Sequence, residues 1–185
     1  MSSHGTQLSS GSDLSMVPTA YCEPRWYAVY TSANQEKRVA EQLGVRSVEH
    51  YLPVYASVRR WKDRRVTLQL PLFPGYVFVR IALRDRLRVQ EVPGVARLVG
   101  FGGTAAALPD KEIEALRTSL EGGARVEPHR YLRVGRRVRV NSGPMTGMQG
   151  ILLQRKGKLR VVISIELIQR SVAVEMDEAD LQPLR

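Results

Sequence analysis

The chain has 185 residues, 43% of them hydrophobic and 25% charged, with a formal net charge of +10 and a pI near 10.2. This length suits one medium domain or two small ones, and no apolar run approaches the ~18 residues of a membrane span. The positive charge favours a polyanionic partner, most simply nucleic acid or a ribonucleoprotein.

The N-terminal segment and the cysteine content restrict the compartment. Residues 1–24 are rich in serine, glycine and threonine and lack the basic and apolar parts of a signal peptide, so we expect a disordered tail. The single cysteine, Cys22, cannot form an internal disulfide, and three scattered histidines add no zinc-binding pattern. We therefore expect a cytoplasmic protein with no membrane segment, metal or cofactor.

The first ordered elements are expected to be a strand and a helix. Residues 26–31 are aromatic and β-branched, which predicts a central strand that is apolar on both faces. Ser32 and Gln35 have the spacing of a capping box, so a helix is predicted to begin at Ser32. It should run to about Leu43 and end at Gly44.

The next stretch predicts a hairpin and a further strand. One strand is expected over 50–60, a charged hairpin tip at 61–65, and a returning strand over 66–70. A proline- and glycine-containing bend over 71–75 leads into a strand over 76–81.

A short helix is then predicted over 85–90, a strand over 95–99, and a last helix that begins at Leu108-Pro109-Asp110. The apolar stripe of that last helix is expected at Ile113, Leu116 and Leu120.

Residues 122–131 are polar and rich in glycine and proline, which indicates a linker. Strands alone are expected after it, at 136–141, 149–154, 159–165, 171–176 and 181–184. Five short strands suffice for a small closed barrel, so the fold class is α+β with a C-terminal all-β domain. At 138–150 the sequence Val-Arg-Val-Asn-Ser-Gly-Pro-Met-Thr-Gly-Met-Gln-Gly indicates a basic strand, a tight turn and a second strand.

The aromatic bend is the first candidate binding site. Pro74 fixes the bend, so Phe73 can project from the end of the sheet, with Tyr76 and Phe78 on one face of the following strand. If these rings are exposed, they form an apolar patch that receives helices of a partner. The alternative is that they pack beneath a helix of this chain.

Basic residues form three further groups in which phosphate contact is plausible. The first group lies at the hairpin tip and consists of Arg59, Arg60, Lys62, Arg64 and Arg65. The second lies on the short helix and consists of Arg84, Arg86 and Arg88. The third lies on the early strands of the C-terminal domain and consists of Arg136, Arg137, Arg139, Arg155, Lys156, Lys158 and Arg160. The sequence contains no HExxH, GxSxG or P-loop motif, so we expect a binding protein and not an enzyme.

In this order, the segments resemble the NusG family of transcription elongation factors. Trp-Tyr-Ala-Val-Tyr at 26–30 resembles the opening of the family's N-terminal (NGN) domain. Leu-Phe-Pro-Gly-Tyr-Val-Phe-Val at 72–79 and Pro-Gly-Val-Ala-Arg-Leu-Val-Gly at 93–100 resemble its central motifs. Pro-Asp-Lys-Glu-Ile at 109–113 resembles the start of its last helix, and 138–150 resembles the KOW motif.

The resemblance implies an NGN-like antiparallel sheet with flanking helices over 25–121, a linker over 122–131, and an SH3-like KOW barrel over 132–185. It also implies a monomer that binds RNA polymerase at the clamp helices of its largest subunit and increases processivity. The polymerase-binding residues carry over to Trp26, Tyr30, Phe73, Pro74 and Tyr76. The short helix falls where specialised paralogues contact the gate loop and non-template DNA, which implicates Arg84, Arg86 and Arg88.

The implied partners of the KOW barrel are the ribosomal protein NusE, the termination factor Rho, or nascent RNA. Here the chain departs from the general pattern, because 166–171 replaces a short Phe-Gly-Arg turn and the partner-binding phenylalanine is absent. The partner-binding positions then fall on Leu167, Ile168 and Arg170. The longer turn is more similar to specialised, operon-restricted paralogues of the RfaH, UpxY and LoaP kind.

A second hypothesis is a ribosome- or RNA-associated KOW protein without direct polymerase action. In that case the basic barrel would dominate binding, and the N-terminal half would serve only as a platform. The complete NGN-like half favours the polymerase-binding factor.

Overall fold

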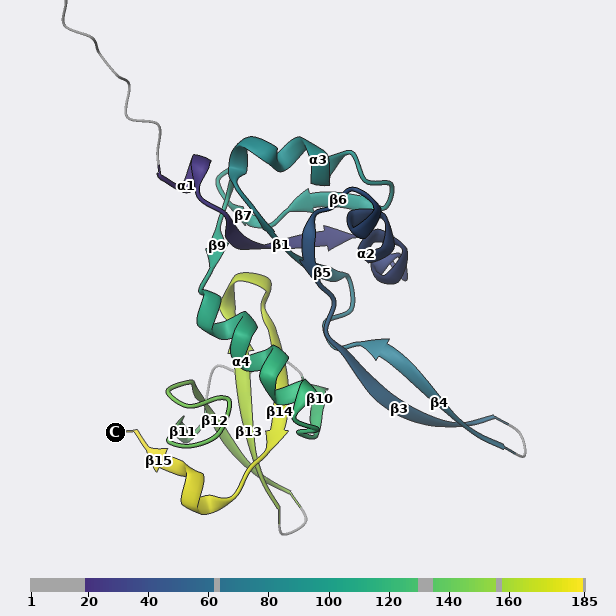
Figure 1. The fold of residues 1–185 in the computed structure, drawn as a ribbon. Helices are drawn as coiled ribbons and strands as arrows, with labels where there is room; N and C mark the ends of the chain where they lie inside the picture. Colours follow the sequence, from purple (N-terminus) through teal and green to yellow (C-terminus); the bar gives the residue numbers. More distant parts are fainter. Residues whose placement is uncertain (1–18, 62–63, 130–134, 156–157, 185) are drawn as a thin grey trace, which may run out of the picture.

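The structure is a computed structural model that describes residues 19–61, 64–129, 135–155 and 158–184 (Figure 1). Most of the tail predicted over 1–24, the tip of the charged hairpin and the end of the predicted linker lie outside the described residues. The elements of the N-terminal half are α1 (Thr19–Cys22), β1 (Arg25–Thr31), α2 (Glu36–Val45), β2 (Glu49–Tyr51), β3 (Val54–Trp61), β4 (Arg64–Pro71), β5 (Tyr76–Ile81), η1 (Leu83–Asp85), α3 (Arg86–Gln90), β6 (Val95–Leu98), β7 (Gly100–Phe101), β8 (Thr104–Ala105), β9 (Ala107–Leu108) and α4 (Asp110–Glu121).

The remaining elements are almost all strands, as predicted for the C-terminal domain. They are β10 (Val126–His129), β11 (Arg137–Val140), β12 (Gln149–Arg155), β13 (Lys158–Ile165), η2 (Glu166–Ile168), β14 (Arg170–Glu175), η3 (Glu178–Asp180) and β15 (Leu181–Pro183). The α+β fold class is therefore confirmed.

The N-terminal sheet has the strand order β2-β5-β1-β6, with β9 paired to β1 beside this path. Strand β1 pairs antiparallel with both β5 and β6, which confirms its predicted central position. Alternate residues such as Tyr27 and Val29 face a core formed with Val39 and Leu43 of α2 and Val89 of α3. One face of the sheet is therefore filled by these two helices.

The start of α2 differs from the prediction. The helix begins at Glu36 and not at Ser32, and no side chain caps it. Asn34 has a left-handed backbone with φ of 59°, and the Ser32 amide donates to the carbonyl of Gly94 at 2.8 Å. Because residues before Glu36 form this turn, the capping-box geometry is not available. The helix also continues past Gly44 to Val45.

The strand predicted over 50–60 is divided in two. Strand β2 joins the sheet, whereas β3 pairs with β4 in a separate two-stranded ribbon that projects away from both domains (Figure 1). The break falls at Leu52-Pro53, since a proline has no amide hydrogen for a ladder. The Pro53 carbonyl instead accepts a 2.8 Å bond from the Leu72 amide at the root of the ribbon.

The C-terminal strands pair in the order β10-β14-β13-β12-β11-β15. The predicted closed barrel of five strands is thus observed as an open path of six, because among the described residues no pairing joins β10 to β15. The sixth strand, β10, lies within the segment predicted as a linker. Gly150 is required where β12 crosses β13, since a Cβ there would lie 2.5 Å from a methyl of Val161.

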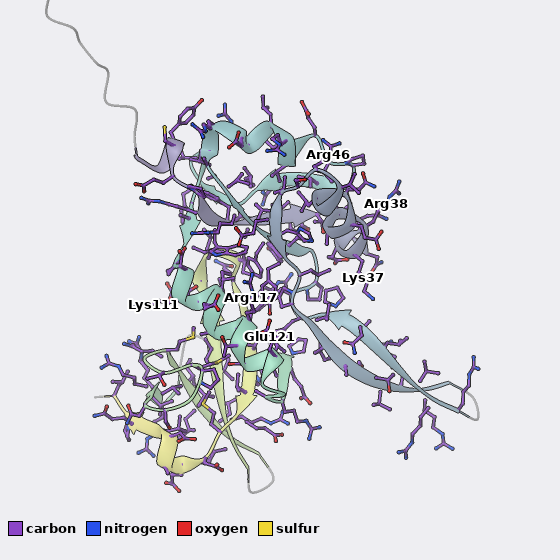
Figure 2. The ribbon with its side chains drawn as sticks, in the orientation of Figure 1. Lys37, Arg38, Arg46, Lys111, Arg117 and Glu121 are labelled. Carbon is purple, nitrogen blue, oxygen red and sulfur yellow. The ribbon has the colours of Figure 1, made fainter. Side chains whose placement is uncertain are left out.

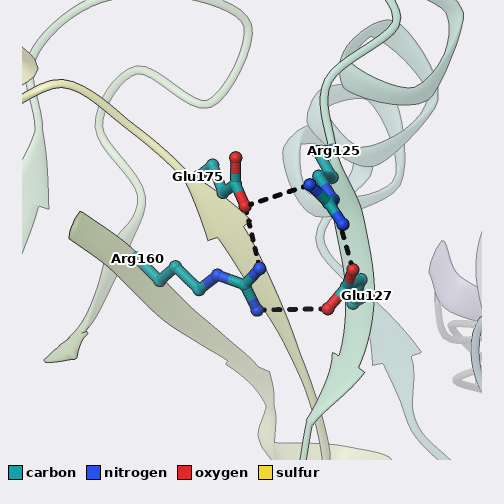
Figure 3. Close-up of polar contacts among 4 residues, drawn as sticks. All are labelled: Arg125, Glu127, Arg160 and Glu175. Atoms are coloured by element: carbon teal, nitrogen blue, oxygen red, sulfur yellow. Dashed lines mark hydrogen bonds and ion pairs between the residues drawn. The ribbon is translucent and has the colours of Figure 1, made fainter. Parts of the chain in front are cut away.

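A network of two arginines and two glutamates holds β10 against the sheet (Figure 3). Arg160 donates to Glu127 at 3.1 Å and to Glu175 at 2.8 Å, and Arg125 donates to Glu127 at 3.3 Å. These bonds raise the pKa of Arg160, so this guanidinium stays charged. Arg125 also lies 3.8 Å from Glu175, so each glutamate is shared by two guanidinium groups, which fixes β10 to β13 and β14.

The two domains share one core. Buried residues from the sheet, from α4 and from the C-terminal strands form a single cluster, which includes Phe78, Ile113, Leu116, Val161 and Val172. Figure 1 shows α4 beside the β13–β14 hairpin, between the sheet and the C-terminal strands. No helix among the described residues is long and apolar enough to cross a membrane.

Candidate partner-binding surface

The second face of the N-terminal sheet carries most of the aromatic side chains singled out from the sequence. In the register of β1 with β5, Ala28 pairs with Phe78 and Tyr30 pairs with Tyr76, and Tyr51 of β2 pairs with Phe78 in turn. Because side chains alternate along a strand, these residues and Trp26 lie on one face. We call this set, together with Phe73 and Pro74 of the bend before β5, the aromatic face.

Part of the aromatic face is core. Phe73 is only 1% exposed and meets Phe78 edge to face, with 5.7 Å between the ring centres. Trp26 is also buried, at 5% exposure. The prediction that Phe73 projects from the sheet end is therefore wrong, and the alternative of packing beneath a helix is correct for Phe73 and Phe78. The bend turns inward because Leu72 and Phe73 both enter the core shared with α4.

The accessible part of the aromatic face consists of Tyr30, Pro74 and Tyr76. Tyr30 is 38% exposed, Pro74 is exposed and Tyr76 is half-buried. The centres of the two tyrosine rings lie 5.4 Å apart. On the other side of β1, the guanidinium of Arg97 in β6 lies 5.4 Å from the centre of the Tyr30 ring. These side chains form a small aromatic and cationic surface of the kind that recognises a partner.

A buried carboxylate, which the sequence did not reveal, holds this surface in place. Glu36, 5% exposed at the start of α2, accepts a 2.7 Å bond from the Gly75 amide. The Gly75 carbonyl accepts a bond from the Thr31 amide, and glycine suits this position because φ is +86° and a Cβ would lie 3.2 Å from the Tyr30 ring. Glu36 therefore fixes the bend between Phe73 and Tyr76, although it is 39 residues away in sequence.

Arg117 of α4 is a second residue that the sequence did not reveal. Its guanidinium lies 5.6 Å from the Trp26 ring and 5.0 Å from the Tyr51 ring, where α4 passes the sheet (Figure 2). Burial raises the pKa of Tyr51 to about 12, although Arg117 acts in the opposite direction. The sequence offered one indication of this contact: Arg117 directly follows Leu116, a buried residue of the predicted apolar stripe.

The turn between β13 and β14 meets the aromatic face. It carries the residues predicted to bind the second partner: Ile168 is buried, Leu167 is partly buried against the shared core, and Arg170 is exposed. The Arg170 guanidinium lies 5.8 Å from the Tyr76 ring. The two predicted binding sets, one from each domain, therefore contact each other within the chain.

An acidic pair lies where α4 faces the same turn. Burial raises the pKa of Glu112, and the nearby carboxylate of Glu166 raises it further. Both side chains line an open cleft of about 1310 Å³ between α4, the loop near Phe101 and the C-terminal strands. A carboxylate pair at a contact between domains opposes that contact when both groups are ionised.

The arginines of the short helix lie elsewhere. Arg84, Arg86 and Arg88 are exposed on η1 and α3, which cover the face of the sheet opposite the aromatic face. Arg88 donates to the Arg46 carbonyl, and Arg86 donates to the Leu83 carbonyl at 3.3 Å. A partner that bound both this group and the aromatic face would have to span the edge of the sheet. Among the described residues no cluster of His, Cys, Asp and Glu could hold a metal ion.

The fold and these surfaces define a two-part binding protein, in which an α+β domain with an aromatic face is joined to a small β domain. Residues 24–117 match the family model described as "Transcription termination factor nusG". The protein named "Transcription termination/antitermination protein NusG" from Vibrio vulnificus is 30% identical, over 86% of this chain and 96% of its own length. Its namesake from Escherichia coli strain K12 is also 30% identical, over 85% of this chain and 95% of its own length.

A solved structure described as "Domain interaction in Thermotoga maritima NusG" has a TM-score of 0.57 at 22% identity. The match covers 88% of this chain and 98% of that one, and it supports the same overall fold. The chain belongs to the NusG family, and it is a NusG-like transcription factor.

Proposed function

We propose that this chain binds RNA polymerase, at the clamp helices of the largest subunit, through the accessible part of its aromatic face. The contact residues are Tyr30, Pro74 and Tyr76, while Trp26 and Phe73 support them from the core. Family membership supports the partner, and the contact between the exposed Tyr30 and the half-buried Tyr76 is the observation that carries the site. The chain then acts as a monomeric, non-enzymatic factor in the cytoplasm that increases processivity.

The C-terminal domain has the recruiting role in this proposal. Leu167, Ile168 and Arg170 would meet NusE, Rho or nascent RNA, and the domains would divide functionally at 25–121 and 132–185. Strand β10 (Val126–His129) is bonded to β14, so the C-terminal unit also includes this strand, which precedes the predicted boundary at 132. The unusual turn at 166–171 supports an operon-restricted role. Arg84, Arg86 and Arg88 are proposed to face the gate loop or non-template DNA.

In the docked arrangement the C-terminal turn covers part of this site, because the Arg170 guanidinium lies 5.8 Å from the Tyr76 ring while Tyr30 and Pro74 stay accessible. We therefore expect polymerase to use the whole of this site only when the C-terminal turn leaves the Tyr76 ring. A partner that binds the turn would favour this opening, since a ligand shifts an equilibrium toward the state that it binds better.

The test is a polymerase pull-down with the full chain and the double variant Tyr30→Ala/Tyr76→Ala. Both side chains are accessible, so the variant should keep its circular dichroism and lose polymerase binding. The matched control is Val58→Ala/Leu68→Ala, which removes exposed apolar side chains elsewhere. Binding that survives in the double tyrosine variant would refute the aromatic-face assignment. Polymerase binding that is absent even in the unaltered chain, with RNA binding retained, would instead support the RNA-associated alternative.

A further inference from the structure

The β3–β4 ribbon is the one large feature that the proposed polymerase site does not use. Its strands pair over eight positions, from Val54 opposite Pro71 to Trp61 opposite Arg64. Among its described residues only Tyr55, at the root, packs against the shared core, and the ribbon then projects into solvent (Figure 1). A two-stranded ribbon without a third strand or a packed face is marginally stable by itself. A projecting ribbon of this length therefore indicates a function outside the core.

Four arginines gather near the outer end of the ribbon. Arg59, Arg60, Arg64 and Arg65 are all exposed. Across the described part of the chain, none of them has an ion-pair or hydrogen-bond partner, and the described strands of the ribbon contain no acidic residue. The ribbon thus presents a concentrated positive charge that nothing described in this chain neutralises.

The register sets these charges on both faces of the ribbon. Arg60 lies directly opposite Arg65, so these two share one face. Arg59 pairs with Val66, and Arg64 pairs with Trp61, which puts both arginines on the other face. Like charges directly opposite one another destabilise a strand pair. An anion bound between Arg60 and Arg65 would remove that cost.

We propose that the outer end of the β3–β4 ribbon binds the phosphate backbone of double-stranded DNA. The major groove of B-form DNA admits a two-stranded ribbon, and phosphates line both of its walls. A ribbon with two arginines on each face can neutralise both walls at once. The major groove of A-form RNA is too narrow and deep for side chains to enter, which favours DNA over duplex RNA. This site is separate from the aromatic face and can be tested without polymerase.

The experiment measures binding of the full chain to a short mixed-sequence DNA duplex by fluorescence anisotropy, over a series of salt concentrations. The variant Arg60→Gln/Arg65→Gln should lose roughly tenfold or more in affinity at low salt, since each phosphate contact contributes a slope of about 0.9 in log affinity against log salt. The magnitude of the slope of log affinity against log salt should fall by about 1.8 when both arginines are replaced. The control Lys37→Gln/Arg38→Gln removes the same charge from the exposed outer side of α2 (Figure 2) and should change the slope little.

A charge reversal separates binding from folding. Arg60→Glu creates an opposite-charge pair with Arg65, so the melting temperature should stay the same or rise while duplex binding is lost. Three results would overturn the proposal: no duplex binding by the unaltered chain at low salt, an equal loss in the α2 control, or tighter binding of single-stranded DNA or duplex RNA than of duplex DNA. Failure of the polymerase pull-down would leave this result unaffected.

Discussion

The guanidinium of Arg170 lies 5.8 Å from the centre of the Tyr76 ring, and this contact joins the two domains. Tyr76 belongs to the aromatic face, and Arg170 follows the turn that ends β13 and η2. A cation–π contact at a partly exposed site contributes about 0.5–1 kcal/mol. This contact adds to the core that the two domains share, so its removal should weaken domain docking by a small amount.

Arg170→Ala is expected to shift the chain toward an open arrangement, because it removes the cation from Tyr76 without altering any residue of the core that the two domains share. We expect a larger radius of gyration in solution scattering and stronger polymerase binding in a pull-down. Arg139→Ala, which removes an exposed arginine from β11, is the control and should change neither. An unchanged radius of gyration for Arg170→Ala would show that other contacts determine the docking.

Phe73→Ala should destabilise the protein and act on binding only through that loss. The side chain is buried and lies edge to face with Phe78, so its removal leaves a cavity and costs about 3–5 kcal/mol. Tyr30→Ala, at a 38% exposed position, should cost much less. Urea denaturation followed by circular dichroism measures both. Similar midpoints for the two variants would contradict the assignment of Phe73 to the core.

Glu36 is expected to be needed for the shape of the aromatic face. Glu36→Ala leaves the Gly75 amide without its acceptor and removes a charged hydrogen bond, which together cost about 2 kcal/mol. Glu36→Gln keeps an acceptor and should cost less than half as much. Glu41→Gln, on the exposed side of α2, is the control. If Glu36→Ala unfolds at the same urea concentration as the unaltered chain, the 2.7 Å bond does not stabilise the bend.

Much of the fold followed from local pattern. The five strands predicted for the C-terminal domain lie within one or two residues of their predicted bounds, since alternating valines and isoleucines between turns are a strong signal, whereas β10 was missed within the predicted linker. The helix α4 also begins at Asp110 as predicted, with Ile113 and Leu116 buried. The predicted start of α2 was wrong because the amide of Ser32 donates to the carbonyl of Gly94, a partner that no local sequence pattern can reveal.

The candidate site was harder to predict, because exposure is decided by what packs on the sheet. The same Phe-Pro-Gly-Tyr sequence suits an open patch or a buried bend, and the choice depends on α4 and on the turn before Arg170. Glu36 and Arg117 went unnoticed for the same reason: their partners, Gly75 and Trp26, are far away in sequence. Periodicity identifies which residues share a face, but not what covers that face.

The acidic pair at the domain contact makes docking depend on pH. In the docked arrangement, burial and then the neighbouring Glu166 carboxylate raise the pKa of Glu112 above its ordinary value of 4.5. A group whose pKa is raised binds its proton more tightly in that arrangement, so its contribution to docking is fully present below pH 4.5. The contribution is lost as the pH rises through the raised pKa. Docking should therefore weaken from mildly acidic toward neutral pH.

Glu112→Gln tests this dependence, because the amide mimics the protonated carboxyl at every pH. The variant should stay more compact at neutral pH than the unaltered chain, with a smaller radius of gyration and weaker polymerase binding. Its radius of gyration should also change less between mildly acidic and neutral pH. Glu41→Gln serves again as the control, and circular dichroism shows whether both domains stay folded over the range. A Glu112→Gln chain that opens with pH as the unaltered chain does would assign the dependence to other groups, and the carboxylate pair would then have no part in separating the domains.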